Sequence, residues 1–167
     1  FGDGGAIFTN DNRLEKKLRL ISNHGQKQKY LYTEIGLNSR LDAIQASILR
    51  VKLKYLNAMN ECRRKNAKLY NSKLNKITEI SIPYCVSTMD FHIFHQYTLI
   101  VKNKKTRDAL KDFLDTKGVS TMIYYPKALH QEIPYKIFNF TKHKVSEDLS
   151  KKVLSLPIHS ELSTQEI

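Results

Sequence analysis

The sequence has no apolar run near the roughly 20 residues that a membrane-spanning helix requires. Its first residues lack the basic stretch followed by an apolar stretch that marks an export signal. Its two cysteines, Cys62 and Cys85, match no metal-binding or redox spacing, so we expect reduced thiols. Together these absences predict a soluble, cytoplasmic protein with no membrane partner.

Basic residues, in contrast, are in large excess. The chain of 167 residues has 28 Lys and Arg against 16 Asp and Glu, a net charge of +12. Such an excess can indicate nucleic-acid binding, but it also suits a small polyanion such as a nucleotide. The longest basic clusters, at residues 63–65 and 102–107, are short and have no interleaved aromatic residues that could stack on bases. We therefore expect no nucleic-acid partner.

Hydrophobic periodicity predicts the elements of the first half of the chain. Residues 6–9 read as a short buried strand, and helical spacing from Leu14 to Ile21 predicts a helix that stops at residues 23–25. Residues 26–37 show no period and are expected to be irregular. Residues 38–74 contain no Pro or Gly and repeat apolar positions every three or four residues, which predicts one long helix of about nine turns.

The second half alternates between the two periods, which indicates a mixed α/β domain. Strands are predicted at residues 77–83, 96–102 and 119–125, and helices at 106–117 and 145–156. Gly118 has the position of a helix stop. Ser163 or Thr164 with Glu166 behind it resembles the start of a further helix, so we expect the chain to be cut at its C-terminus.

An anion site is predicted where the long helix begins. Ser39 and Asp42 have the spacing of a capping box, which would place the helix start at Ser39. Asn38 and Arg40 would then flank a helix N-terminus, where free N–H groups favour a phosphate. The alternative is that Asn38 only adopts a left-handed turn and that Arg40 is a surface residue.

Several ordered motifs give this sequence a family resemblance. They are GDGGAIFTND, RxIxNHGQ from Arg19 to Gln26, IGLNSRLDAIQASILRVKL, HQYTLIV, VSTMIYYPKALHQEIPY and SLPIHSEL. The set resembles the DegT/DnrJ/EryC1/StrS family of nucleotide-sugar aminotransferases, which depend on pyridoxal 5'-phosphate (PLP). The resemblance extends over nearly the whole chain.

The resemblance implies the α/β fold of type I, aspartate-aminotransferase-like PLP-dependent transferases. Residues 1–45 would end the large PLP-binding domain, and residues 46–167 would form the bridging helix and a small C-terminal α/β domain that is truncated at its end. In the family, the lysine that forms the Schiff base with PLP lies just upstream of the GDGGA segment. We therefore expect no catalytic residue in this chain and no activity from it alone.

The resemblance also assigns candidate site residues. Asn38 matches an Asn that reaches the PLP phosphate of the neighbouring subunit, which implies a homodimer with shared active sites. Arg40 matches a residue near that site that suits the sugar acid or pyrophosphate of the substrate. Tyr124 and Tyr125 match a His-Tyr pair that lines the nucleotide-sugar pocket, with Tyr124 in place of the His. His130 either contacts substrate or caps a turn.

Other residues are expected to be structural. His95, Gln96 and Tyr97 enter a predicted strand and should pack or lie at a sheet edge. Asp3, between glycines, is expected to fix a turn. The histidines at positions 92, 143 and 159 show no metal-ligand grouping, so no metal site is predicted.

By resemblance, the whole enzyme would move an amino group, with glutamate as the expected donor, to a keto-sugar linked to a nucleotide diphosphate. The segment YYPKALHQEIPY is most similar to members that act on UDP-3-keto-hexuronic acids for surface polysaccharide. dTDP- or UDP-linked 4-keto-6-deoxy sugars remain open. A PLP-dependent sugar dehydratase of the same fold and a non-catalytic basic module that binds nucleic acid are the alternatives.

Overall fold

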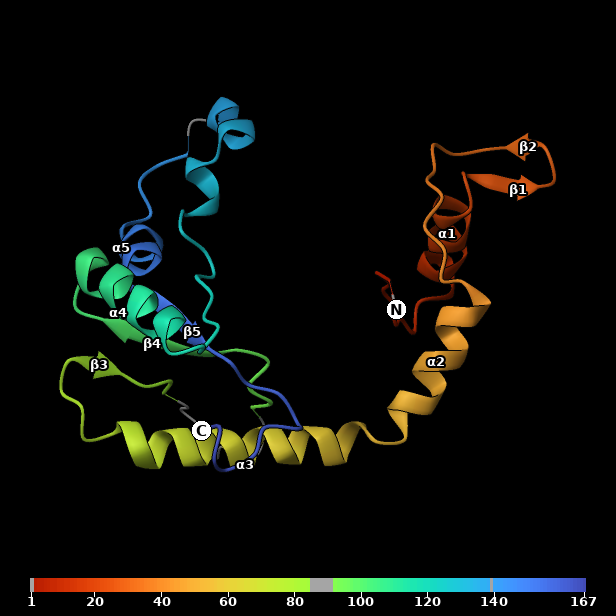
Figure 1. Ribbon diagram of the computed structural model, residues 1–167. Helices are drawn as coiled ribbons and strands as arrows, with labels where there is room; N and C mark the ends of the chain where they lie inside the picture. The colour runs from red at the N-terminus through yellow and green to blue at the C-terminus, as the bar shows by residue number, and fades with distance from the viewer. Residues whose placement is uncertain (1, 85–91, 139) are drawn as a thin grey trace. The chain divides into compact units, whose positions relative to one another are not determined.

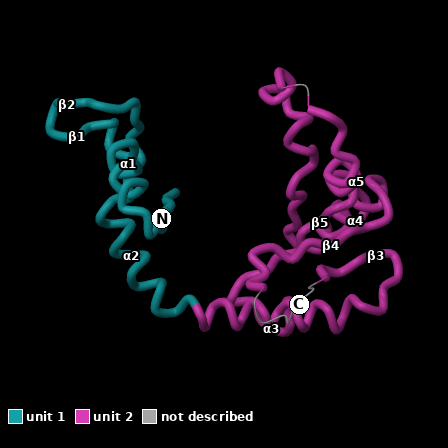
Figure 2. Tube along the Cα trace, turned by 180° about the vertical axis from the view of Figure 1, so that it is seen from behind, with its two compact units in different colours: residues 1–56 teal, residues 57–167 magenta. Residues whose placement is uncertain are grey.

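The computed structural model describes residues 2–84, 92–138 and 140–167, so that Cys85 lies outside the described residues. It divides into two compact units, Phe1–Leu56 and Asn57–Ile167 (Figure 2). The expected domain boundary after residue 45 refers to a whole subunit and stays a prediction. No helix in the described part of the chain is long and apolar enough to cross a bilayer.

The first regular element of the first unit is helix α1, Asn12–Ser22, as the sequence predicts. Asp11 caps it, because its carboxylate accepts hydrogen bonds from the backbone N–H groups of Arg13 and Leu14 at 2.7 and 3.2 Å. The irregular segment predicted after this helix instead contains an antiparallel hairpin of β1, Gln26–Gln28, and β2, Leu31–Tyr32 (Figure 1).

The strand predicted at residues 6–9 is wrong. That segment has no regular structure, and Ile7 and Phe8 are 71% and 92% exposed. An apolar run of this length becomes a strand only when a neighbour completes its hydrogen bonds, and no described strand lies beside it. Its apolar side chains instead lie open to solvent in this unit.

The single long helix predicted for residues 38–74 is two helices, α2 at Ala43–Leu53 and α3 at Leu56–Leu74. Between them, the backbone N–H groups of Lys54 and Tyr55 bond to carbonyls three residues earlier, at 3.2 and 3.0 Å. This tighter spacing interrupts the helix. The apolar period continues across the break and no Pro or Gly marks it, so the sequence pattern could not reveal it.

The second unit is built on a three-stranded antiparallel sheet in the order β3-β4-β5. The strands are β3 at Ile80–Ser81, β4 at Tyr97–Val101 and β5 at Val153–Leu156. Helix α3 lies on one side of the sheet, and helices α4, Lys104–Thr116, and α5, Lys144–Lys152, lie on the other (Figure 1). Two short 3-10 turns, Leu129–Gln131 and Ile133–Phe138, precede α5.

Two predicted elements of this unit need correction. The predicted strand at residues 119–125 reduces to one bridge, in which Met122 exchanges backbone hydrogen bonds with Ser155 at 3.1 and 2.8 Å. The last helix ends at Lys152, and the apolar residues that follow form β5 rather than a further turn. The strand predicted at residues 96–102 and the helix predicted at residues 106–117 are confirmed as β4 and α4, and Gly118 follows the helix with a positive φ.

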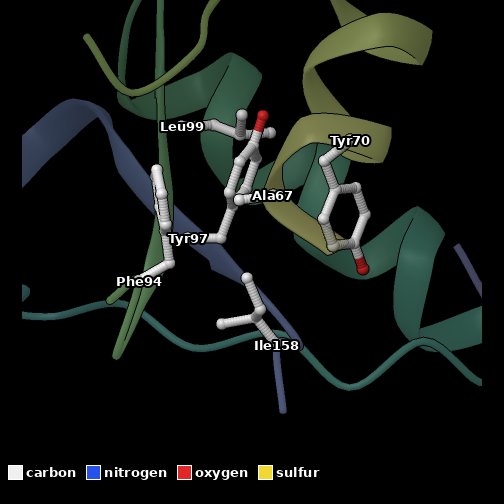
Figure 3. Packing of buried hydrophobic residues seen from close by; sticks show 6 residues of the cluster. All are labelled: Ala67, Tyr70, Phe94, Tyr97, Leu99 and Ile158. Atoms are coloured by element: carbon white, nitrogen blue, oxygen red, sulfur yellow. The ribbon is translucent and has the colours of Figure 1, made fainter. Parts of the chain in front are cut away.

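The core joins α3 to the sheet. Ala67 and Tyr70 of α3 pack on Phe94, Tyr97 and Leu99, with Ile158 beneath them (Figure 3). The rings of Tyr70 and Tyr97 stack with centroids 4.8 Å apart. Tyr97 is fully buried, and its hydroxyl donates a hydrogen bond to Asn71 Oδ1 at 2.5 Å. Burial raises the pKa of Tyr97 to about 12, so this hydroxyl stays neutral at physiological pH.

We expect Tyr97→Phe to lower the free energy of unfolding by about 1 to 2 kcal/mol, because it leaves a part-buried amide oxygen without its donor. Urea denaturation of the purified protein measures this change. Tyr84→Phe is the matched control, since Tyr84 is 87% exposed and should be neutral. Equal effects of the two substitutions would show that the Tyr97 hydrogen bond contributes nothing.

Candidate functional site

Asn38 lies on a backbone segment that is fastened to the end of α1. The N–H of Leu37 donates to Ile21 O at 2.7 Å, the N–H of His24 donates to Leu37 O at 2.8 Å, and the N–H of Ser39 donates to Ser22 O at 2.9 Å. These bonds flank Asn38 on both sides, so its backbone position is fixed although its side chain is exposed.

Glycine makes this close approach possible. Gly25 lies just after α1 with φ of +70°, and a Cβ placed on it would lie 1.8 Å from the carbonyl oxygen of Glu34. A Cβ on Gly36 would lie 2.1 Å from the backbone nitrogen of Gly25. Side chains at either position would force apart the two backbone segments that hold Asn38.

Asn38 and Arg40 line a hollow of about 840 Å³ within the first unit. The other charged residues of its lining are Asp3, Glu15 and Arg19, and the last two form an ion pair with each other. Among the described residues, the Asn38 amide and the Arg40 guanidinium have no hydrogen-bond or ion-pair partner. Two free donors of this kind suit an anion.

The predicted helix N-terminus does not contribute to this anion site. Helix α2 begins at Ala43 with Asp42 as its N-cap, and the capping box pairs Asp42 with Gln45 rather than Ser39 with Asp42. The Gln45 side chain accepts from the Asp42 N–H at 3.2 Å. Since a carboxylate already lies at the helix start, the case for an anion rests on the side chains of Asn38 and Arg40.

Tyr124 and Tyr125 lie in the second unit, beside β5. The backbone bridge between Met122 and Ser155 holds this segment against the strand. The two rings meet edge to face, with centroids 5.6 Å apart, and they are 38% and 69% exposed. Tyr124 lines a hollow of about 310 Å³, whereas Tyr125 faces solvent more openly.

His130 has an internal partner. Its Nε2 lies 3.0 Å from Oε1 of Glu147 on α5, and the same oxygen accepts from the backbone N–H of His143 at 3.1 Å. The hydrogen bond from His130 is the main cause that lowers the pKa of Glu147. These contacts connect the segment after Tyr125 to α5, and a contact of His130 with substrate stays a prediction.

The Glu147 contact predicts a pH-dependent stability. A carboxyl whose pKa is lowered by folding stabilises the fold above its unfolded pKa of about 4.3, and that contribution is lost as the pH falls through the folded value. We expect Glu147→Gln to lower the Tm at pH 7 and to match the unsubstituted protein at strongly acid pH. Thermal unfolding across pH measures this, with the exposed Glu161→Gln as control. A Tm difference independent of pH would contradict a stabilising role of the ionised Glu147 carboxylate.

Sequence reasoning missed part of the hollow beside Tyr124. Its lining includes His95 and Gln96, which were expected to be packing or sheet-edge residues. The expectation is confirmed for Tyr97, which is fully buried. A signal was present, because the polar residues Gln96 and Thr98 flank the buried Tyr97 in the sequence, and alternate residues of a strand point to opposite faces.

Comparison with known proteins identifies the family. The sequence profile of the DegT/DnrJ/EryC1/StrS aminotransferase family matches residues 1–167, the whole chain. This chain belongs to that family. The resemblance inferred from its motifs is therefore confirmed.

The relatives are enzymes of nucleotide-sugar metabolism for the most part. The chain is 39% identical over 166 residues to a UDP-N-acetyl-3-dehydro-alpha-D-glucosamine 3-aminotransferase of Acidithiobacillus ferrooxidans, covering 99% of this chain and 44% of that protein. It is 35% identical to a UDP-2-acetamido-2-deoxy-3-oxo-D-glucuronate aminotransferase of Pseudomonas aeruginosa. This match covers 100% of this chain and 45% of that protein. It is also 38% identical to a Geobacillus stearothermophilus protein named a pleiotropic regulatory protein. This match covers 99% of this chain and 45% of that protein. Relatives named as transaminases of dTDP-linked amino sugars match at 36%.

A solved structure of a related protein has the same fold over nearly all of this chain. The crystal structure of S. venezuelae DesV in complex with a ketimine intermediate matches with a TM-score of 0.85 at 32% identity, over 95% of this chain and 42% of that one. The chain thus has part of the fold of the sugar aminotransferases, with mixed helix and sheet. It spans less than half the length of the curated relatives it matches.

Proposed function

We propose that this chain is part of a PLP-dependent aminotransferase that transfers an amino group from glutamate to a keto-sugar linked to a nucleotide diphosphate. The membership of the whole chain in the aminotransferase family carries this proposal. The lysine that binds PLP would lie upstream of Phe1 in the complete subunit, so the residues described here would bind and orient cofactor and substrate. The enzyme would act in the cytoplasm.

The donors of the first unit suit anions, with Asn38 proposed for the phosphate of PLP and Arg40 for the pyrophosphate or the sugar acid of the substrate. Asn38 offers an uncharged amide and Arg40 a cation, and neither is used by another described residue. Their backbone is fastened to α1, so both donors would be positioned before the cofactor arrives. When bound, PLP supplies the electron sink of the reaction, and the protein supplies orientation and charge.

Exposed apolar residues of the first unit support a homodimer with shared active sites. Of its described residues, Gly25 alone is buried, while Phe8, Ile35 and Ile44 are 92%, 97% and 76% exposed. A surface of this kind needs cover from the rest of the subunit and from a second subunit. In the dimer, Asn38 would bind the PLP phosphate of the partner.

In the second unit, Tyr124 and Tyr125 would line the nucleotide-sugar pocket. Arg40, a residue of the first unit, is a separate candidate for contact with the pyrophosphate or the sugar acid of the substrate. His130 is a further candidate contact through the ring nitrogen that Glu147 does not use. The preferred substrate is a UDP-3-keto-hexuronic acid for surface polysaccharide. The Pseudomonas aeruginosa relative, named for a 3-oxo-glucuronate, supports this choice.

A substrate panel tests the proposal. The complete subunit, loaded with PLP and given glutamate, is incubated with UDP-linked 3-keto-hexuronate, UDP-linked 3-keto-hexosamine and dTDP-linked 4-keto-6-deoxy sugar. We expect the highest kcat/KM with the 3-keto-hexuronate. Turnover of the 4-keto sugar alone would refute the substrate assignment and leave the reaction class intact.

A further inference from the structure

The proposed function places Tyr124 at the nucleotide-sugar pocket but leaves open which part of the substrate the hollow beside Tyr124 would hold. Its volume of about 310 Å³ lies at the lower end of the range for small-molecule pockets. Its polar lining residues are His95, Gln96, Ser120, Thr121, Tyr124 and Ser155, and the rest of the lining is apolar. None of the described lining residues is Lys, Arg, Asp or Glu.

Gln96 is the polar side chain here with the most unused hydrogen-bonding capacity. It is half-buried, and its amide has no hydrogen-bond partner within the described ranges. The neighbouring hydroxyls of Thr98 and Ser155, in contrast, bond to each other at 2.8 Å. The Gln96 amide can both donate and accept, so it can bind a hydroxyl or an acyl group.

A second polar group at the same hollow is also unsatisfied. The hydroxyl oxygen of Thr121 is buried and has no hydrogen-bond partner among the described residues. Buried polar groups without partners are uncommon in folded proteins and call for an explanation, such as a bound molecule. The Thr121 oxygen is itself covered, so the partly exposed amide of Gln96 is the group that can bind a ligand in the hollow as it stands.

The walls of the hollow are fixed by α3. One guanidinium nitrogen of Arg63 donates to the carbonyl oxygens of Phe94 at 3.2 Å and Ile158 at 2.9 Å. Tyr70 donates its hydroxyl to the carbonyl oxygen of Pro157 at 2.9 Å. The loop before β4 and the loop after β5 are thus held by the same helix, and the hollow is formed in advance of any ligand.

We propose that Gln96 determines specificity for the sugar, with its amide bound to an uncharged hydroxyl or acyl group of the sugar ring beside Tyr124. This inference rests on the proposed function. None of the described lining residues is a Lys or Arg that could pair with a diphosphate or with the carboxylates of glutamate, so the uncharged part of the substrate fits the hollow best.

Ligand binding to the complete subunit tests this assignment through the variant Gln96→Leu, which removes the amide at similar size. The probes are UDP with UDP-N-acetylglucosamine, and dTDP with dTDP-glucose, titrated by calorimetry. For the pair that binds, we expect Gln96→Leu to leave the Kd of the free nucleotide unchanged and to weaken the nucleotide sugar about tenfold. Gln165→Leu, an exposed glutamine that does not line the hollow, should change neither value.

Two results for Gln96→Leu would overturn the inference: an unchanged Kd for the nucleotide sugar, or equal weakening of nucleotide and nucleotide sugar. Failure of the proposed function would be seen earlier, in the unsubstituted subunit, as no binding of either pair. That result would refute the nucleotide-sugar substrate and, with it, the role of Gln96.

Discussion

Gly25→Ala is expected to lower the free energy of unfolding by at least about 3 kcal/mol, a large effect for one methyl group. The added Cβ would lie 1.8 Å from the carbonyl oxygen of Glu34, and the backbone at φ of +70° is unfavourable for any side chain. The segment that carries Asn38 must then separate from α1. We therefore expect faster hydrogen exchange at the amides of Leu37 and Ser39, and weaker PLP binding in the complete subunit.

Gly118→Ala is the matched control for this effect. Gly118 has a nearly identical φ of +74°, but no atom lies within 4 Å of a Cβ placed there. Its substitution should cost only the strain of the left-handed backbone, about 1 to 2 kcal/mol. Equal costs at the two glycines would show that the close approach of Gly25 to Glu34 is not a constraint on the fold.

Asn38→Ala is expected to weaken PLP binding about 10- to 100-fold in the complete subunit, because it removes a hydrogen bond to the charged phosphate. Equilibrium dialysis of PLP measures the change. Asn12→Ala is the control, since Asn12 is an exposed asparagine of the same unit that does not line the hollow. Equal PLP affinity in the two variants would remove Asn38 from the cofactor site.

Mixed dimers test whether Asn38 acts on the partner's cofactor. One subunit carries Asn38→Ala, and the other carries a substitution of the PLP lysine, which we propose lies upstream of Phe1. In the mixed dimer, one site combines an intact lysine with an intact Asn38 from the partner. We expect the isolated mixed dimer to have about half the activity of the unsubstituted dimer, whereas no recovery would contradict the shared site.

The sequence predicted individual elements better than it predicted their boundaries. Helices α1 and α4 follow from a cap, an apolar period and a stop, which are all local signals. The break between α2 and α3 and the change from α5 to β5 are not local, since the apolar period runs through both. At residues 153–156, pairing with β4 decides the structure.

The candidate site was predicted unevenly, for similar reasons. The segment around Asn38 and Arg40 could be found from its motif, but the hydrogen bonds that fasten it to α1 depend on residues 21–24. The prediction that a helix N-terminus contributes to the anion site was wrong. A capping pattern can be satisfied by more than one pair of residues, and the structure uses Asp42 with Gln45. Gln96 was assigned to the sheet, since neighbours such as Thr121 and Ser155 come from distant parts of the sequence.

Transfer of labelled nitrogen tests the proposed function most directly. The complete PLP-loaded subunit is incubated with 15N-glutamate and the UDP-linked 3-keto-hexuronate, and the products are analysed by mass spectrometry. The account predicts one 15N atom in each amino-sugar product and one equivalent of 2-oxoglutarate. A sugar product that has lost water and contains no 15N, or glutamate that remains unconsumed, would contradict it.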